Sequence, residues 1–309
     1  MRIGIIDFGT NTLRLDIFET EEKEYRSIYD FAIYSKIVEN TVGTSLSQDG
    51  IEHIIQAIEE HQQACRHYRC DRVECFSTAS LRYIDNAVDV LEQVEFRTGM
   101  KIRMISGDEE ATYDYLALKS VVDVPFGVGC DLGGGSLQVF TFNEEGPVLS
   151  ASYPLGSSRT AKNFSKGPIP TMDEISAIKK CVKDSLSETG FKIAGGTLFA
   201  MGGTAKAIKA LYNATIEKGD KLSLKNVNIM LKLLSESPEE AVELISSVAA
   251  KRTRTLVPGL AVLSGVMETF GCDGMKIYSV GVREGFMESI LNDDSKPEPS
   301  ILDFILGSI

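Results

Sequence analysis

The stretch GVGCDLGGGSLQVF, residues 127–140, decides the expected fold. It begins as an apolar strand, ends that strand with Asp131, and turns through three glycines into a second apolar strand. Glycine has no Cβ and tolerates positive φ, so backbone N–H groups in such a turn can approach an anion closely. Ser136 adds a hydroxyl at the end of the turn. The stretch therefore predicts a hairpin whose tip carries a carboxylate, N–H donors and a hydroxyl.

A second stretch of the same layout stands at the N-terminus. The predicted strand 2–6 ends in Asp7, Gly9 makes the turn, and residues 13–18 alternate apolar and polar side chains as a returning strand does. A single glycine hairpin is more simply interpreted as an ordinary turn. Two hairpins with an Asp at the same place instead predict two similar domains facing a cleft, each offering an Asp and N–H donors to one phosphate-bearing ligand.

The composition is that of a globular protein. The chain has 309 residues, of which 43% are hydrophobic, enough for two domains with proper cores. Its net charge of −12 argues against a general nucleic-acid or anionic-membrane surface. The six cysteines form no CxxC pair, which favours reduced thiols over a zinc site or a disulfide framework. With no signal-peptide pattern and no long apolar run, we expect a cytoplasmic protein with neither a nucleic-acid nor a membrane partner.

All three histidines lie within residues 50–70. Isoleucines recur there at helical spacing, so the segment predicts an amphipathic helix. Because His53 lies off the apolar stripe, we expect its histidines to be solvated surface residues. Because no histidine lies elsewhere, we expect neither a Ser-His-Asp triad nor a His-rich metal site, and any general base should be a carboxylate.

Elsewhere short apolar strands alternate with helical segments. Thr171 and Glu174 form a capping box that opens a helix, and the glycine pair 202–203 stands between a strand and a helix, where N–H groups bind anions. Further strands are expected at 72–76, 101–105, 148–154, 198–201 and 275–280.

This pattern of hairpins followed by strand and helix units is used twice, which predicts an α/β fold with two domains. The first is expected at 1–120, joined by a C-terminal helix at about 295–309, and the second at 121–294.

Seven segments, in order and spread over nearly the whole chain, resemble the motifs of the exopolyphosphatase and guanosine pentaphosphate phosphohydrolase family. They are IIDFGTNTLRL (5–15), STASLRYIDNA (77–87), ISGDEEA (105–111), DLGGGS (131–136), PLGSSR (154–159), MGGTAKAI (201–208) and GVREG (281–285). The resemblance implies two ribonuclease-H-like domains around a cleft, as in actin, sugar kinases and chaperone ATPases. The chain is similar to the short members, without additional C-terminal domains.

The resemblance also implies an activity. It is the Mg²⁺-dependent (or Mn²⁺-dependent) hydrolysis of terminal phosphoanhydride bonds, releasing phosphate from polyphosphate, from guanosine pentaphosphate of the stringent response, or from both.

The same resemblance implies a role for each matching residue. Glu110 matches the catalytic glutamate, which orients or deprotonates the attacking water, while Asp7 and Asp131 match the metal-binding aspartates. The residues expected to bind substrate phosphates are Gly9, Asn11, Thr12, Arg14, Arg82, Gly133, Gly134, Gly135, Ser136, Gly202, Gly203 and Thr204.

Two positions depart from the family pattern. The loop that commonly reads GGGSTE reads GGGSLQ here, so Gln138 replaces an acid, and Lys206 replaces a common Arg. Gln138 is therefore a candidate modulator of metal binding or turnover.

Several alternatives stay open at this point. The second hypothesis is a weakly active or inactive sensor that binds polyphosphate or guanosine penta- or tetraphosphate, and the third is a kinase or ATPase of the same fold. The sequence does not choose between the two substrates, and it leaves the oligomeric state open, including a homodimer.

Overall fold

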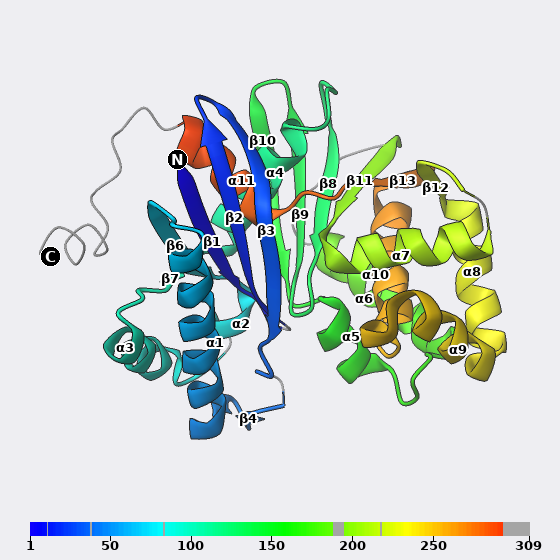
Figure 1. Cartoon of the computed structure of the whole chain (residues 1–309). Helices are drawn as coiled ribbons and strands as arrows, with labels where there is room; N and C mark the ends of the chain where they lie inside the picture. Colours follow the sequence, from blue (N-terminus) through cyan, green and yellow to red (C-terminus); the bar gives the residue numbers. More distant parts are fainter. Residues whose placement is uncertain (11, 38, 83, 188–194, 217, 293–309) are drawn as a thin grey trace, which may run out of the picture. The chain divides into compact units, whose positions relative to one another are not determined.

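The computed structural model describes residues 1–10, 12–37, 39–82, 84–187, 195–216 and 218–292 (Figure 1). The chain divides into two compact units, one of Met1–Ser106 joined by the described residues from Met287, the other of Gly107–Phe286. The helix Gly107–Lys119 groups with the second unit, whereas the sequence placed the domain boundary after it, at residue 120. The helix expected at 295–309 lies outside the described residues.

The first unit is built on a five-stranded sheet in the order β3-β2-β1-β6-β7. The first three strands form an antiparallel meander, and β6 and β7 continue the sheet in parallel with β1. The strands are β1 (Arg2–Phe8), β2 (Thr12–Glu21), β3 (Glu24–Tyr34), β6 (Arg72–Ser77) and β7 (Arg103–Met104), with a small ladder of β4 (Thr41–Val42) and β5 (Ser45–Leu46). The helices are α1 (Gln48–His67), α2 (Ala79–Arg82) and α3 (Ala87–Thr98).

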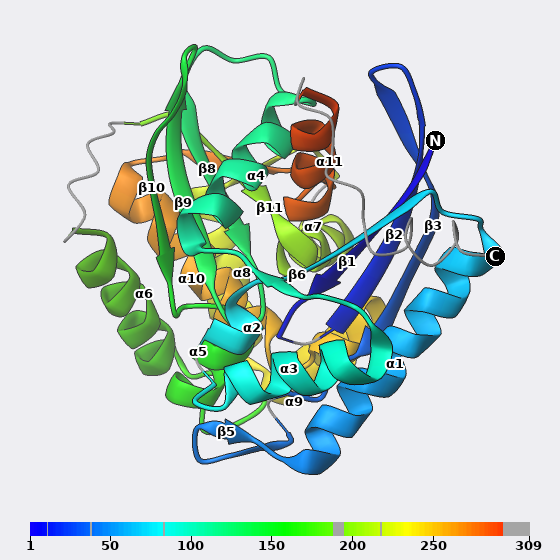
Figure 2. The same ribbon diagram turned by 90° about the vertical axis from the view of Figure 1, so that its left-hand side faces the viewer.

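Helix α1 packs along this sheet, as Figure 2 shows. It begins at Ser47, whose hydroxyl accepts the Gly50 N–H at 3.2 Å and so satisfies one of the free donors of the first turn. Its buried stripe includes Ile51, Ile54 and Ile58, which join the core formed by the inward side chains of β1 and β2.

The prediction that the histidines of α1 are solvated is wrong for His61. This side chain is fully buried, and its Nε2 lies 3.1 Å from the Leu13 carbonyl oxygen of β2. His61 follows Ile54 and Ile58 at helical spacing, so it continues the apolar stripe that His53 avoids. Burial lowers the pKa of its imidazole, because the charged form loses its hydration.

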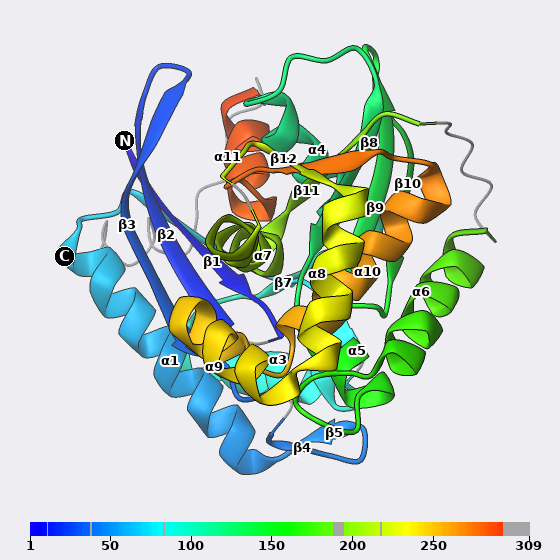
Figure 3. The same ribbon diagram turned by 90° about the vertical axis from the view of Figure 1, so that its right-hand side faces the viewer.

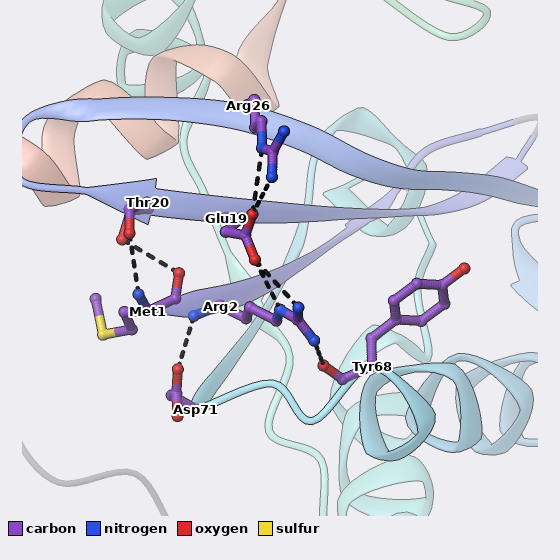
Figure 4. A network of polar contacts seen from close by, with 7 residues as sticks. All are labelled: Met1, Arg2, Glu19, Thr20, Arg26, Tyr68 and Asp71. Carbon is purple, nitrogen blue, oxygen red and sulfur yellow. Dashed lines mark hydrogen bonds and ion pairs between the residues drawn. The ribbon is translucent and has the colours of Figure 1, made fainter.

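A polar network fixes the start of β1 (Figure 4). The Arg2 guanidinium donates to the carbonyl oxygen of Tyr68 at the end of α1, at 2.8 Å, and to the carboxylate of Glu19, at 3.1 Å. Glu19 also accepts from Arg26 on β3. The bond to Arg26, followed by that to Arg2, lowers the pKa of Glu19. Because Arg2 and Glu19 are only partly buried and Arg26 is exposed, the network sets the position of the strand rather than adding much stability.

The second unit has a six-stranded sheet in the order β10-β9-β8-β11-β13-β12. Strands β8 to β10 form an antiparallel meander, β11 and β13 run parallel to β8, and β12 is antiparallel to β13. The strands are β8 (Gly127–Leu132), β9 (Leu137–Asn143), β10 (Gly146–Tyr153), β11 (Thr197–Met201), β12 (Lys221–Ser223) and β13 (Gly274–Ile277). The helices are α4 (Gly107–Lys119), α5 (Ser157–Phe164), α6 (Met172–Ser187), α7 (Gly202–Thr215), α8 (Leu224–Glu236), α9 (Pro238–Ala249), a 3-10 turn η1 (Ala250–Arg252), α10 (Leu256–Phe270) and α11 (Val282–Asn292), the last of which ends among residues grouped with the first unit.

The two faces of this sheet meet different helices because side chains alternate along each strand. Leu137 and Val139 of β9 join the larger core, in which α10 lies between the sheet and α6, with α8 beside it (Figure 3). Phe140 and Phe142 point to the opposite face and pack against Tyr115 of α4. The glycines of β8 make room for these rings, since a Cβ at Gly129 would lie 2.2 Å from the Phe140 ring.

The two sheets share one topology. Strands β1, β2, β3, β6 and β7 of the first unit correspond in order and direction to β8, β9, β10, β11 and β13 of the second. This repeat confirms the predicted α/β fold with two ribonuclease-H-like parts. Among the described residues, no helix has both the length and the apolar character needed to cross a membrane.

Candidate phosphate-binding and catalytic site

The predicted hairpin of the first unit forms at the end of β1. Asp7 lies opposite Arg14 in the β1–β2 ladder, and the turn is closed by the Gly9 N–H, which donates to the Thr12 carbonyl oxygen at 3.0 Å. Asn11, between these two, lies outside the described residues.

The segment after β6 lies at the same end of this sheet. The Thr78 N–H approaches the Phe8 carbonyl oxygen at 3.5 Å, and the Ser80 hydroxyl donates to the same oxygen. The short helix α2, which ends with the half-buried Arg82, is thereby held beside the Asp7 turn.

Arg14 has a protein partner. Its Nε donates to Asp30 Oδ1 on β3 at 2.6 Å, and its Nη2 makes a second, close contact with Asp30 Oδ2. A substrate phosphate would have to compete with this carboxylate for the guanidinium, so the phosphate-binding role of Arg14 stays a prediction.

The hairpin of the second unit repeats the first in detail. The Gly133 N–H donates to the Ser136 carbonyl oxygen at 3.1 Å, as Gly9 does to Thr12, and Asp131 lies opposite Gln138 as Asp7 lies opposite Arg14. The expectation that the two hairpins are related in form is confirmed.

Helix α5 holds the glycine turn from behind. The N–H groups of Ser157 and Ser158 donate to the carbonyl oxygens of Gly133 and Gly134, both at 2.9 Å. Gly156 makes this close approach possible, because a Cβ there would lie 2.3 Å from the Ser136 nitrogen. The PLGSSR segment therefore clamps the turn and directs two of its carbonyls towards α5. Within the described residues, the N–H groups at the tip of the turn, at 134 and 135, have no acceptor.

Asp131 is enclosed by two glycines. A Cβ on Gly202 would lie 2.3 Å from Asp131 Oδ1, and one on Gly281 would lie 3.4 Å from Oδ2. Gly202 also has φ +90°, a conformation that other residues rarely adopt. These contacts bring the MGGT and GVREG segments to the carboxylate that ends β8.

Helix α4, which carries Glu110, covers the face of the sheet to which Phe140 and Phe142 point. At its start, Ser150 Oγ lies 3.4 Å from Asp108 Oδ1, and further along Tyr115 packs on Phe140. Glu110 is only 7% exposed and is one of the buried residues of α4. By strand alternation, Ser136 and Gln138 share the α4 face with Phe140. The predicted catalytic acid, Asp131 and the glycine turn thus all belong to the second unit.

Three further residues of the second unit, near this turn or on α4, were not predicted from the sequence. Asp114 is a second buried acid on α4, one turn after Glu110, and its spacing of four could have revealed it. The other two are Arg252 and Ser157. Arg252 Nη1 donates to Thr204 Oγ1 at 3.1 Å, and Thr204 Oγ1 lies 3.1 Å from the Ser157 hydroxyl. The basic run KRTR at 251–254, in so acidic a chain, was the available signal.

The remaining predicted residues are placed as follows. Thr204 is 1% exposed, and its hydroxyl is engaged by the contacts just described. Gly203 lies beside Arg252, whose Nη2 would be 2.5 Å from a Cβ there. Lys206 donates to the Ser279 carbonyl oxygen at 3.2 Å.

The side chains around Asp131 limit the kind of metal ion that could bind there. Within the described part of the chain, no group of three or more His, Cys, Asp or Glu side chains is arranged to hold a metal ion. A cation bound to Asp131 would therefore rely on water and on substrate phosphates for most of its ligands, which is the usual behaviour of Mg²⁺. Cys130, next to Asp131, is unsuited to be a ligand or a nucleophile, because burial raises the pKa of its thiol well above the ordinary value.

Fold and site together define an α/β protein of two similar units, each with a strand that ends at an Asp and a tight turn after it, and comparison with known proteins gives the family. The model of the Ppx/GppA phosphatase family matches residues 29–294. The chain belongs to this family, which confirms the resemblance and the predicted enzyme class, a phosphoanhydride hydrolase.

The individual relatives have low sequence identity to this chain but align with most of its length. The chain is 23% identical to exopolyphosphatase 1 of Mycobacterium tuberculosis, over 96% of this chain and 90% of that protein. The crystal structure of the Aquifex aeolicus family member matches with a TM-score of 0.81 and 23% identity, covering 96% of this chain and 99% of that one. An exopolyphosphatase structure from Cytophaga hutchinsonii also gives a TM-score of 0.81, with 17% identity over 94% of this chain and 98% of that one.

Proposed function

We propose that the protein is a Mg²⁺-dependent (or Mn²⁺-dependent) exopolyphosphatase, which releases terminal phosphate from inorganic polyphosphate. The observation that carries this proposal is the glycine turn that follows Asp131, whose N–H groups at 134 and 135 have no acceptor within the described residues, in the unit whose helix α4 buries Glu110. The similarity to curated exopolyphosphatases along almost the whole chain supports polyphosphate as the substrate.

In the proposed reaction the turn holds the terminal phosphoryl group. The N–H groups of Gly134 and Gly135 donate to its oxygens, and the clamp from α5 keeps them in place without reorganisation. Asp131 would bind the metal, which neutralises charge on the phosphates. Positioning and charge neutralisation are most of what phosphoryl transfer requires of a protein.

Glu110 supplies the proton acceptor. The water oxygen bonds to the terminal phosphorus while the bridging P–O bond breaks, the water proton passes to Glu110, and the shortened chain leaves with the electron pair of that bond. A carboxylate suits this role in a chain whose three histidines all lie on α1.

Two other functions remain as alternatives. Guanosine pentaphosphate offers the same terminal phosphoanhydride, so it is the second candidate substrate. A weakly active or inactive sensor of polyphosphate or guanosine phosphates is favoured by one feature, the neutral Gln138 buried beside the turn.

Phosphate release from purified protein with Mg²⁺ distinguishes these possibilities. Long polyphosphate, tripolyphosphate, guanosine pentaphosphate and ATP would be compared at equal terminal-phosphate concentration. We expect the highest kcat/KM on polyphosphate. Faster release from guanosine pentaphosphate would assign the nucleotide as substrate, and preference for ATP would contradict the proposal.

A further inference from the structure

Gln138 is almost completely buried, and both hydrogens of its amide are in use. Nε2 donates to Ser136 Oγ at 2.7 Å and to Ser152 Oγ at 3.0 Å. Gln138 and Ser136 are 1% and 3% exposed. The amide therefore joins the end of the glycine turn to strand β10, whose Ser152 lies opposite Gln138 in the ladder.

These bonds determine what the Ser136 hydroxyl can do. An amide nitrogen has hydrogens to donate and no lone pair to offer, so Ser136 Oγ acts as the acceptor and its own hydrogen must point elsewhere. Among the described residues, that hydroxyl donates to no group. A buried O–H without an acceptor is unfavourable, and an oxygen of a bound anion would satisfy it.

The neighbouring donors indicate the class of that anion. Ser136 directly follows the turn whose tip N–H groups, at 134 and 135, also have no acceptor within the described residues. A phosphoryl group has several charged oxygens and can accept from such converging donors.

We propose that Gln138 is a positioning residue that fixes the Ser136 hydroxyl as a hydrogen-bond donor to a substrate phosphate oxygen. The identity of the substrate rests on the proposed function. A carboxylate at position 138 would act in the opposite way, because its oxygens only accept and would take the Ser136 hydrogen themselves. The Gln in this chain thus adds a donor to the phosphate site instead of a negative charge.

A double-mutant cycle tests this role. The variants are Ser136→Ala, Gln138→Glu and the double variant, measured by calorimetric binding of tripolyphosphate and by KM for polyphosphate at saturating Mg²⁺. In the wild-type background we expect Ser136→Ala to weaken binding about tenfold, the effect of losing a hydrogen bond to a charged group. In the Gln138→Glu background the same change should cost less than about twofold, because the hydroxyl is already lost to the phosphate.

Gln138→Glu and the double variant both carry the new Glu, so its charge repulsion affects both equally and cancels when their binding is compared. Gln138→Met is similar in length but has no hydrogen-bond donors, so it repeats the cycle without a new charge. In that background Ser136→Ala should again weaken tripolyphosphate binding less than it does in wild type. Ser176→Ala, on the exposed side of α6, is the matched control and should leave binding unchanged. Thermal melting confirms that each variant is folded.

Two results would overturn the proposal: an equal loss from Ser136→Ala in every background, or no loss in wild type. The binding measurement needs no turnover. Coupling between the two positions in a protein that hydrolyses nothing would support the inference and contradict the proposed enzyme, whereas hydrolysis without coupling would do the reverse.

Discussion

Of the three acids at the start of α4, Asp108, Glu109 and Glu110, the last is the one that is buried. In the sequence all three are equivalent, because acids are favoured in any first helical turn by the helix dipole. The sheet beneath α4 makes the distinction. The sequence could identify Glu110 only through its resemblance to the family motif.

The first prediction concerns this carboxylate. Glu110→Gln keeps the shape of the side chain but removes the proton acceptor, so kcat should fall by about 100-fold or more while KM changes little. The measurement is steady-state phosphate release from polyphosphate. Glu109→Gln, the partly exposed neighbour, is the matched control and should retain turnover. A near-normal kcat in Glu110→Gln would show that Glu110 is not the catalytic base.

The second prediction concerns Gly202. An Ala Cβ there would lie 2.3 Å from Asp131 Oδ1, so Gly202→Ala should displace the carboxylate and raise the Mg²⁺ concentration needed for half-maximal activity. Gly196→Ala isolates the cost of backbone strain, because Gly196 has φ +103° and no heavy atom within 4 Å of its Cβ position. That control should lose about 1 to 3 kcal/mol of stability and keep its Mg²⁺ response. Equal Mg²⁺ curves for both variants would show that Gly202 does not position Asp131.

Among the helices and strands, those strands with a one-sided or fully buried pattern of apolar side chains were predictable. Strand β8 and its hairpin, strand β11 and the Thr171–Glu174 capping box are confirmed, the last by two reciprocal bonds of 2.9 and 3.3 Å. Strand β3 could not be predicted, because this edge strand is partly exposed on both faces and has no clear alternation of apolar and polar side chains.

The third prediction concerns α1 and its buried His61. Because its folded-state pKa lies below the unfolded value, the unfolded chain binds more protons as the pH falls through about 6.5, and stability should decrease there. Thermal melts from pH 8 to pH 5 should show this loss in wild type and a flatter curve in His61→Phe. His67→Gln, an exposed position on the same helix, should keep the wild-type pH dependence. If the melting temperature of His61→Phe depends on pH as strongly as that of wild type, groups other than His61 cause the loss of stability.

In the molecule as a whole, the presence of two similar units could be predicted from the sequence, because both hairpins carry an Asp at the same place and a glycine turn after it. The side-chain contacts around the glycine turn of the second unit could not be predicted from the sequence. Arg252, Thr204 and Ser157 come from three separate helical segments, and only the folded chain brings their side chains together.

The fourth prediction compares the two halves of the duplication. If both loops serve the activity, Asp7→Ala and Asp131→Ala should each raise the Mg²⁺ requirement. The check is a Mg²⁺ titration of phosphate release for both variants and wild type. Sensitivity in only one of them would restrict metal binding to that loop.

Repeated turnover of polyphosphate is the property that separates the proposed enzyme from a sensor. The most direct measurement is phosphate release from a large excess of long polyphosphate, counted per protein molecule, with Mg²⁺ and again with EDTA, for wild type and Glu110→Gln. We predict many phosphates per wild-type molecule with Mg²⁺ and strong losses both with EDTA and in Glu110→Gln. Saturable polyphosphate binding with no more than one phosphate released per molecule would contradict the enzyme and favour the sensor.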